Sequence, residues 1–256
     1  MKRRLAVYAF IAVALGLLSA ADSDIQARLK KIDSMITFSE GDFSAEYTIA
    51  QDKPGEGTSV SKAAVFRRDR IGTYLILMLE PADDKGKGYL KVGDSLWVYD
   101  PADRRFTFTS AKEQFRNSNA RNSDFGRSNL SGNYEVRSVG RVKLGKFDCS
   151  VLDLYALNAD VAFPHSRMWV TDDDLIRKTE DYSLSGQLMR IVATPTYQKI
   201  GNHYSPVNIL IVDQLRGKTI GGKFLNEKTQ ISIAKPSLSP QPDSLYSQAY
   251  LEKVSQ

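Results

Sequence analysis

The sequence predicts a mainly β protein (α+β) built on an antiparallel sheet. Segments in which apolar and polar residues alternate recur along most of the chain. Turns containing Gly, Asn and Asp separate these segments at short and even intervals, and helical periodicity is confined to the two ends. Short strands joined by tight turns are typical of a meander or barrel rather than of βαβ units. A chain of 256 residues can bury a large core of this kind in one domain.

The N-terminus has the pattern of a signal peptide. A basic stretch from Met1 to Arg4 precedes an apolar run from Leu5 to Leu18, and small residues follow at Ser19, Ala20 and Ala21. We expect residues 1–21 to be cleaved near Ala21 and residues 22–256 to fold as one domain in the periplasm. The alternative is an uncleaved N-terminal anchor.

Composition and charge narrow the function classes. Hydrophobic residues make up 42% and charged residues 25% of the chain, as in ordinary globular proteins. The net charge of +5 falls to +2 without Lys2, Arg3 and Arg4, because 32 basic residues then face 30 acidic residues. This balance gives no electrostatic case for binding nucleic acid, and it makes a membrane-surface protein the weaker alternative.

The first predicted element after the signal peptide is an amphipathic helix. Ser23 and Gln26 fit a capping box. Apolar residues then recur at helical spacing, at Ile25, Leu29, Ile32 and Ile36. Such a helix needs an apolar surface to lie on.

Two series of strands follow the helix. The first series is expected over residues 43–49, 60–66, 74–79, 89–92, 95–99 and 105–109. The strand at 74–79 is apolar on both faces, which indicates that it is covered on both sides. The second series is expected over residues 134–142, 147–157, 166–171, 175–183, 187–196, 207–215, 218–226 and 229–234.

Two segments do not fit the strand pattern. Residues 117–133 are rich in Asn, Ser, Arg and Gly, so we expect a polar insert that is either a solvated connection or a mobile lid. Residues 236–256 begin as a Pro-rich stretch and end in a possible closing helix at 243–254.

No residue pattern predicts an enzyme, a metal site or a cofactor. Cys149 lies in an alternating segment and is best interpreted as a small buried apolar residue. His165 and His203 are the only histidines, and no cluster has metal-ligand spacing. Three consecutive acids, Asp172 to Asp174, are better interpreted as a solvated turn than as a catalytic or metal site.

Several motifs resemble those of one family. They are Val65-Phe66-Arg67-Arg68, the hairpin Gly93-Asp94-Ser95-Leu96-Trp97-Val98-Tyr99-Asp100-Pro101, Met168-Trp169-Val170-Thr171, the run from Asp181 to Leu188, and Ser244-Leu245-Tyr246 with Leu251. Together they resemble the LolA-like outer-membrane lipoprotein-sorting protein family, in its larger branch. The resemblance covers nearly the whole chain after the signal peptide as a pattern of elements.

The resemblance implies a strongly curved antiparallel sheet, an unclosed barrel, whose concave face is covered by helices. It implies a monomeric periplasmic carrier that takes acyl chains of lipoproteins or other lipids from an inner-membrane extruder to an outer-membrane receptor. A lid-tethering arginine would correspond to Arg67, with Arg68 as the competitor. The insert at 117–133 and the long C-terminus depart from the compact carrier.

An apolar cavity needs lining residues, and large apolar side chains of the predicted strands are the candidates. They are Tyr47, Phe66, Tyr74, Ile76, Leu77, Trp97, Tyr99, Phe106, Phe108 and Met168. Ordinary core packing is the alternative for each of them. The competing function is a non-catalytic envelope module with the same fold that binds a protein partner or senses stress.

Overall fold

The computed structural model describes residues 24–255, so the predicted signal peptide and the Ser23 cap lie outside the described residues. Thirteen strands form one antiparallel sheet. Their bounds are β1 (Phe43–Lys53), β2 (Gly57–Arg68), β3 (Thr73–Glu80), β4 (Gly88–Val92), β5 (Ser95–Asp100), β6 (Arg105–Thr109), β7 (Tyr134–Leu144), β8 (Phe147–Ala156), β9 (His165–Thr171), β10 (Ile176–Tyr182), β11 (Leu188–Ile200), β12 (His203–Ile220) and β13 (Lys223–Ser237).

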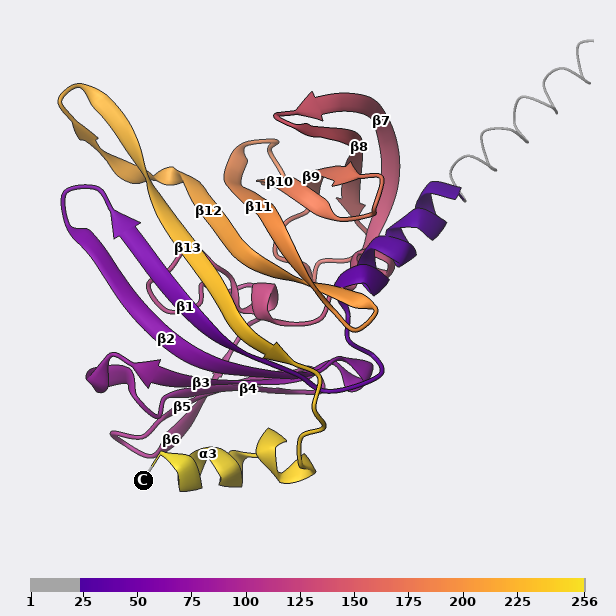
Figure 1. The fold of residues 1–256 in the computed structure, drawn as a ribbon. Helices are drawn as coiled ribbons and strands as arrows, with labels where there is room; N and C mark the ends of the chain where they lie inside the picture. Colours follow the sequence, from indigo (N-terminus) through magenta and orange to yellow (C-terminus); the bar gives the residue numbers. More distant parts are fainter. Residues whose placement is uncertain (1–23, 256) are drawn as a thin grey trace, which may run out of the picture.

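The order of the strands explains how one sheet can form a cup. The order is β6-β5-β4-β3-β2-β1-β13-β12-β11-β10-β9-β8-β7, so the chain starts in the middle of the sheet and meanders to one edge. It then crosses to the opposite edge at β7 and meanders back until β13 pairs with β1. The sheet bends strongly around a concave face, and β6 and β7 remain separate edges (Figure 1). The predicted mainly β, unclosed antiparallel architecture is confirmed.

One prediction of strand boundaries is wrong. Three strands were expected between residues 207 and 234, but the chain forms the two long strands β12 and β13, with the turn at Gly221 and Gly222. Gly217 marks a shift in pairing register instead of a turn. A Cβ atom there would lie 2.2 Å from the Leu225 carbonyl oxygen, so the two backbones approach too closely for any larger residue.

The two terminal helices cover opposite faces of the sheet. The N-terminal helix is described over residues 24–36, and its buried Leu29 and Ile32 pack against Leu154, Met168 and other concave-face residues of β7 to β9. The C-terminal segment forms the 3-10 helix η4 (Asp243–Tyr246) and helix α3 (Gln248–Val254). It packs on the outer face of β3 to β5, where Leu251 is fully buried (Figure 1). The closing helix therefore does not cover the concave face, because strand β3 is apolar on both sides and its outer side also needs a cover.

The crossing between β6 and β7 covers much of the concave face. It contains the 3-10 helix η3 (Asn122–Phe125) and the short helix α2 (Leu130–Asn133). Phe115, Ala120 and Phe125 are fully buried against the inner residues of β1 to β5. The expectation of a solvated connection is therefore wrong, because a few apolar anchors bury part of a polar segment whose backbone groups find partners within the crossing and on side chains of the sheet.

Cys149 and the three consecutive acids at residues 172–174 have structural surroundings in the folded protein. Cys149 is fully buried, as predicted, and burial raises the pKa of its thiol. Asp172 to Asp174 lie in a turn, as predicted, but only Asp172 and Asp173 are exposed; Asp174 is buried and pairs with Arg28 and Lys31 of the N-terminal helix. Within residues 24–255, no cluster of three or more His, Cys, Asp or Glu side chains is arranged to hold a metal ion. The same residues include no helix with the length and apolar character needed to cross a membrane.

Candidate functional site

A cavity of about 440 Å³ lies between the concave face of the sheet and the segments that cover it. Strands β9 to β13 form its floor, and the crossing segment, the 160–163 loop and the end of the N-terminal helix form its roof. Ligand pockets in proteins commonly have volumes of about 300–1,000 Å³. The cavity is therefore large enough for a small ligand or part of a chain-like one.

One wall of the cavity is aliphatic. It is made by inward residues on three neighbouring strands, which are Val192, Ile209, Ile211, Ile231 and Ile233. The register places Ile209 opposite Ile231 and Val192 opposite Ile211, so their side chains form adjacent rows on one face. Ile36 and Phe38 approach this wall from the end of the N-terminal helix. These aliphatic residues offer a ligand dispersion contacts and carry no charge themselves.

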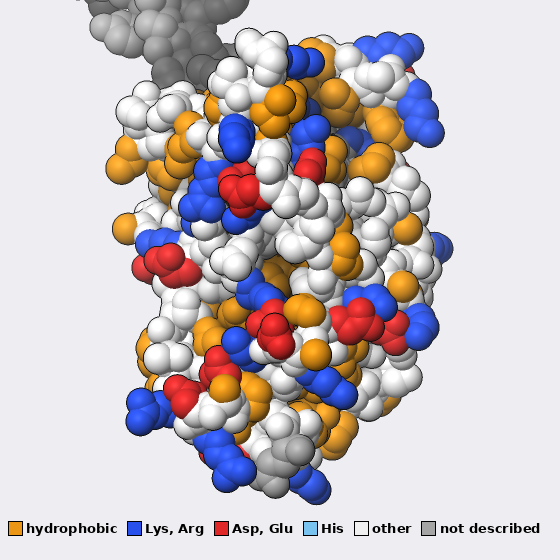
Figure 2. Space-filling model, turned by 90° about the vertical axis from the view of Figure 1, so that its left-hand side faces the viewer, with side chains coloured by type: hydrophobic (Ala, Val, Ile, Leu, Met, Phe, Trp, Pro, Cys, Tyr) orange, Lys and Arg blue, Asp and Glu red, His pale blue; other side chains and the backbone are white. Residues whose placement is uncertain are grey.

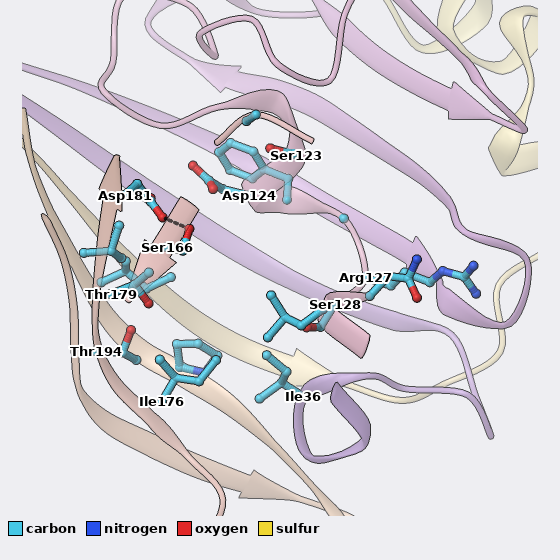
Figure 3. Close-up of a pocket in the computed structure, with 18 of the residues that line it drawn as sticks. Ile36, Ser123, Asp124, Arg127, Ser128, Ser166, Ile176, Thr179, Asp181 and Thr194 are labelled. Carbon is cyan, nitrogen blue, oxygen red and sulfur yellow. Dashed lines mark hydrogen bonds between the residues drawn. The ribbon is translucent and has the colours of Figure 1, made fainter. Parts of the chain in front are cut away.

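The other end of the cavity is polar and ionic. Arg190 on β11 donates to Asp181 at 2.7 Å and forms two hydrogen bonds, of 2.7 and 2.9 Å, with Asp124 of η3. Ser166 donates to the second oxygen of Asp181 at 2.6 Å. In Figure 3, Asp124, Ser166 and Asp181 lie together, whereas Ile36 and Ile176 lie toward the other end. The cavity is thus amphipathic along its length.

Arg190 stays charged in this buried position. Burial by itself would lower the pKa of its guanidinium, but the facing carboxylates of Asp124 and Asp181 more than offset this and raise the pKa above its ordinary value. Because Asp124 belongs to the crossing segment and Asp181 to β10, Arg190 ties the roof of the cavity to its floor.

Two further hydrogen bonds hold the crossing segment on the sheet. The Tyr74 hydroxyl donates to the Asn122 carbonyl oxygen at 3.0 Å, and the Asn119 backbone N–H donates to the Thr229 hydroxyl oxygen at 2.8 Å. Phe125 lies between Tyr47 and Phe115, with ring centroids 5.9 and 4.4 Å away. One half of the concave face is therefore packed by the crossing segment, and the other half contains the cavity.

Comparison with known proteins assigns this chain to a family. A family model described as "-like: Uncharacterized protein" matches residues 72–253, which is well over half of the chain. The chain belongs to this family. The matched residues include the crossing segment, the cavity floor and most of α3. No curated protein matches the chain.

Solved structures identify the fold of this family member as LolA-like. A LolA superfamily protein from Nitrosomonas europaea is 23% identical, with a TM-score of 0.74 over 88% of this chain and 98% of that one. A domain named as an outer membrane lipoprotein-sorting protein, from Vibrio parahaemolyticus, is 15% identical, with a TM-score of 0.77 over 89% and 97%. A DUF1329 family protein from Desulfovibrio piger is 19% identical, with a TM-score of 0.75 over 91% and 98%. The resemblance stated from the sequence is confirmed at the level of the fold.

The predicted lining residues separate into three groups in this LolA-like sheet. Tyr47 and Met168 line the cavity. Tyr74 and Ile76 lie on the same concave face but in the half that the crossing segment packs. The remaining six lie on the outer face, where Phe66, Leu77, Tyr99 and Phe106 pack with the C-terminal segment and Trp97 pairs with the exposed Phe108. A ligand-binding role for Tyr47 and Met168 stays a prediction.

The two candidate tethering arginines point to different partners. Arg67 lines the cavity, forms a buried pair with Asp69 at 2.6 Å and donates to the Ile36 carbonyl oxygen at 3.4 Å. It thereby contacts the last residue of the N-terminal helix, and its guanidinium lies 5.4 Å from the centroid of the Phe38 ring. Arg68 instead forms two hydrogen bonds with Asp42 and one with Asp243 of the C-terminal segment.

The ionisation of Asp42, which pairs with Arg68 and Arg70, makes the stability of the fold depend on pH. Its buried carboxylate accepts hydrogen bonds from Arg68, Arg70 and the Gln241 backbone N–H, and the Arg68 hydrogen bond is the main cause that lowers its pKa from 3.8 to about 2. A carboxyl group whose pKa is lower in the folded than in the unfolded protein stabilises the fold at any pH above its unfolded pKa. This stabilisation is lost as the pH falls through the folded pKa.

We expect the free energy of unfolding to drop by about 2 kcal/mol between pH 4 and pH 2 because of Asp42. Urea unfolding of the parent and of Asp42→Asn at a series of pH values would measure this. The variant should be less stable at neutral pH and should show a flatter dependence in the acid range. Asp83→Asn, at an exposed turn, is the control and should behave like the parent. An unchanged acid dependence in Asp42→Asn would contradict the assignment.

The sequence carried signals for the residues that sequence reasoning missed. Ile209 and Ile211, and likewise Ile231 and Ile233, alternate with polar or exposed positions in their strands. Arg190 is a single charge inside the apolar run Leu188-Met189-Arg190-Ile191-Val192. A charge in such a strand requires a buried partner, but the sequence does not show that the partner is Asp124, 66 residues away.

Proposed function

We propose that the protein is a periplasmic, non-catalytic carrier that binds acyl chains of lipoproteins or other lipids in this cavity and passes them toward the outer membrane. The observation that carries the proposal is the aliphatic wall formed by β11 to β13 in the cavity on the concave face. The names of the LolA superfamily protein and of the lipoprotein-sorting domain with the same fold are in keeping with it.

The physical basis is burial of methylene groups. Each CH₂ that leaves water for an apolar wall contributes about 0.8 kcal/mol, so several methylenes along the isoleucine rows give useful affinity without any precise polar contact. The ionic end at Arg190, Asp124 and Asp181 is already satisfied internally and would lie beside the more polar part of the ligand.

The experiment is native mass spectrometry with lipid extraction on residues 22–256 purified from the periplasm. We expect a co-purifying acyl-chain mass and saturable binding of a fluorescent fatty acid. A clean protein mass together with no uptake of the probe would contradict the carrier and favour a module that binds a protein partner.

A pair of neighbouring substitutions tests the location. Ile209 points into the cavity, whereas Leu210 is exposed on the outer face of the same strand. Ile209→Trp should fill the cavity and weaken probe binding by about tenfold or more, which corresponds to at least about 1.4 kcal/mol. Leu210→Trp is the matched control and should bind as the parent does. Circular dichroism and urea unfolding would establish that both variants fold, and equal binding by both variants would place the ligand elsewhere.

A further inference from the structure

The end of the β12–β13 hairpin is an exposed surface that the cavity does not use. All residues from 215 to 225 are exposed, and they include four large apolar side chains: Leu215, Ile220, Phe224 and Leu225. Figure 1 shows this hairpin projecting beyond the neighbouring β1–β2 hairpin at one side of the cup. Exposed apolar groups gathered at one projecting tip indicate a contact surface more strongly than the same groups scattered singly.

All charged side chains of residues 215–225 are positive. Residues 215–225 contain Arg216, Lys218 and Lys223 and no acid, although the chain without residues 1–21 is nearly balanced overall. Among the ion pairs of residues 24–255, none involves these three cations. Figure 2, which looks onto this side of the molecule, shows basic and apolar side chains next to one another near its upper end. The hairpin tip is therefore a local concentration of available positive charge.

The strand register mixes the two kinds of side chain. Lys218 pairs with Leu225 and Ile220 pairs with Lys223, so each of these cross-strand neighbours joins a cation to an apolar group. Phe224 lies across from Thr219. Apolar groups interleaved with cations suit the boundary between lipid headgroups and acyl chains, where both kinds of partner are available at neighbouring depths.

The hairpin is held in a fixed conformation. At its base the Asp213 carboxylate accepts hydrogen bonds from the backbone N–H groups of Leu215 and Arg216, both at 2.8 Å, and Asn226 donates to the Asp213 carbonyl oxygen at 2.7 Å. A side chain at Gly55, in the β1–β2 turn, would meet Lys218 and Ile220, so this turn lies directly against the hairpin. The Asp213 carboxylate at the base is thus occupied by backbone N–H groups of the hairpin and forms no ion pair with the three cations of residues 215–225.

We propose that residues 215–225 dock the protein on the surface of an anionic lipid bilayer. Phe224, Leu225 and Ile220 enter the headgroup region, and the three cations contact lipid phosphates. Anionic bilayers attract basic segments that lie within a Debye length, and salt screens this attraction. The proposal does not depend on whether the cavity binds an acyl chain.

The β7–β8 hairpin is the competing surface and supplies matched controls. It exposes Val139 and Val142 and carries Lys143 and Lys146, but it has no aromatic residue among its large exposed side chains, and its Arg141 is paired with Asp172. Because its apolar side chains are smaller and one of its cations is neutralised, we assign docking to the β12–β13 hairpin.

The test is flotation of residues 22–256 with vesicles of phosphatidylethanolamine and phosphatidylglycerol, and with vesicles of phosphatidylcholine alone. We expect binding to the anionic vesicles that falls by about tenfold or more between about 0.1 M and about 0.5 M salt. The variants Lys218→Glu with Lys223→Glu, and Phe224→Ser with Leu225→Ser, should each weaken binding by about tenfold or more.

The controls separate this surface from the alternatives. Lys143→Glu with Lys146→Glu, and Leu184→Ser at another exposed turn, should bind vesicles as the parent does, and so should the cavity variant Ile209→Trp. Parent protein that ignores anionic vesicles, or hairpin variants that bind as the parent does, would overturn the proposal. Loss in the β7–β8 variant alone would move the docking surface to that hairpin. Loss in Ile209→Trp alone would show that lipid uptake by the cavity causes the flotation, and would also overturn the proposal.

Discussion

Replacing Arg190 by leucine is expected to destabilise the protein by about 3–5 kcal/mol. The substitution removes the only group that joins Asp124 to Asp181 among the ion pairs of the described residues, and Asp181 is itself buried. Two carboxylates would then lie close together without a cation, and each would have to be hydrated or protonated. Since small proteins have total stabilities of about 5–15 kcal/mol, this loss is a large part of the whole.

Urea unfolding at neutral pH would measure the loss, with Arg141→Leu as the control. Arg141 forms an exposed pair with Asp172, and such pairs contribute only about 0–1 kcal/mol. Combining Arg190→Leu with Asp124→Asn and Asp181→Asn should restore part of the stability, because no unpaired charge would remain. A single Arg190→Leu variant as stable as the Arg141→Leu control would show that the buried network is unimportant.

The same substitution should loosen the roof of the cavity. Asp124 belongs to η3, so losing Arg190 removes the two hydrogen bonds that fix η3 to the floor. We expect faster hydrogen exchange at residues 119–127 in a variant that remains folded, with little change in β1 and β2. Uniform acceleration across the whole sheet would mean that Arg190 stabilises the fold without specifically holding the crossing segment.

Replacing Phe125 by alanine is expected to cost about 3–5 kcal/mol. Phe125 is fully buried and contacts Tyr47 and Phe115 where the packed half of the concave face meets the cavity. Truncating it removes ring contacts and leaves a void that continues into the existing space of about 440 Å³. We therefore expect the Phe125→Ala variant both to be less stable and to have a larger cavity.

Urea unfolding and probe binding would separate these two effects. Phe108→Ala is the control, since Phe108 is 62% exposed on the outer face and its loss should change stability by well under 1 kcal/mol. If the cavity is the acyl site, Phe125→Ala should accept bulkier fatty-acid probes than the parent does while being less stable. A variant with the stability of the parent would mean that the crossing segment repacks, and lost stability without any change in probe selection would separate Phe125 from the ligand site.

The strand pattern was predictable because it depends on local chemistry. Alternation such as Phe43, Ala45, Tyr47 and Ile49 needs only the two-residue period of a strand, and glycine-containing turns fix where most hairpins reverse. The error at Gly217 arose because a glycine required for a close backbone approach resembles a turn glycine in the sequence. The motifs around Arg67 and Trp97 also supported a resemblance that the fold confirms.

The choice of cavity residues was not predictable from the same pattern. Period-two alternation separates the two faces of a strand but does not say which face is concave, and β3 is apolar on both. Leu77 and Tyr99 consequently lie under the C-terminal segment, although they were expected at the cavity. The face is decided by the curvature of all thirteen strands together.

The sequence by itself therefore determined the β-rich architecture, the amphipathic N-terminal helix, the buried thiol and the family resemblance, because each depends on residues close together in the chain. The tertiary structure alone decided that a polar segment would be buried by Phe115 and Phe125, and that Arg190 would find Asp124. It also decided that isoleucines from two late strands would form one wall. These features rest on contacts between residues distant in sequence, and only folding of the sheet creates such contacts.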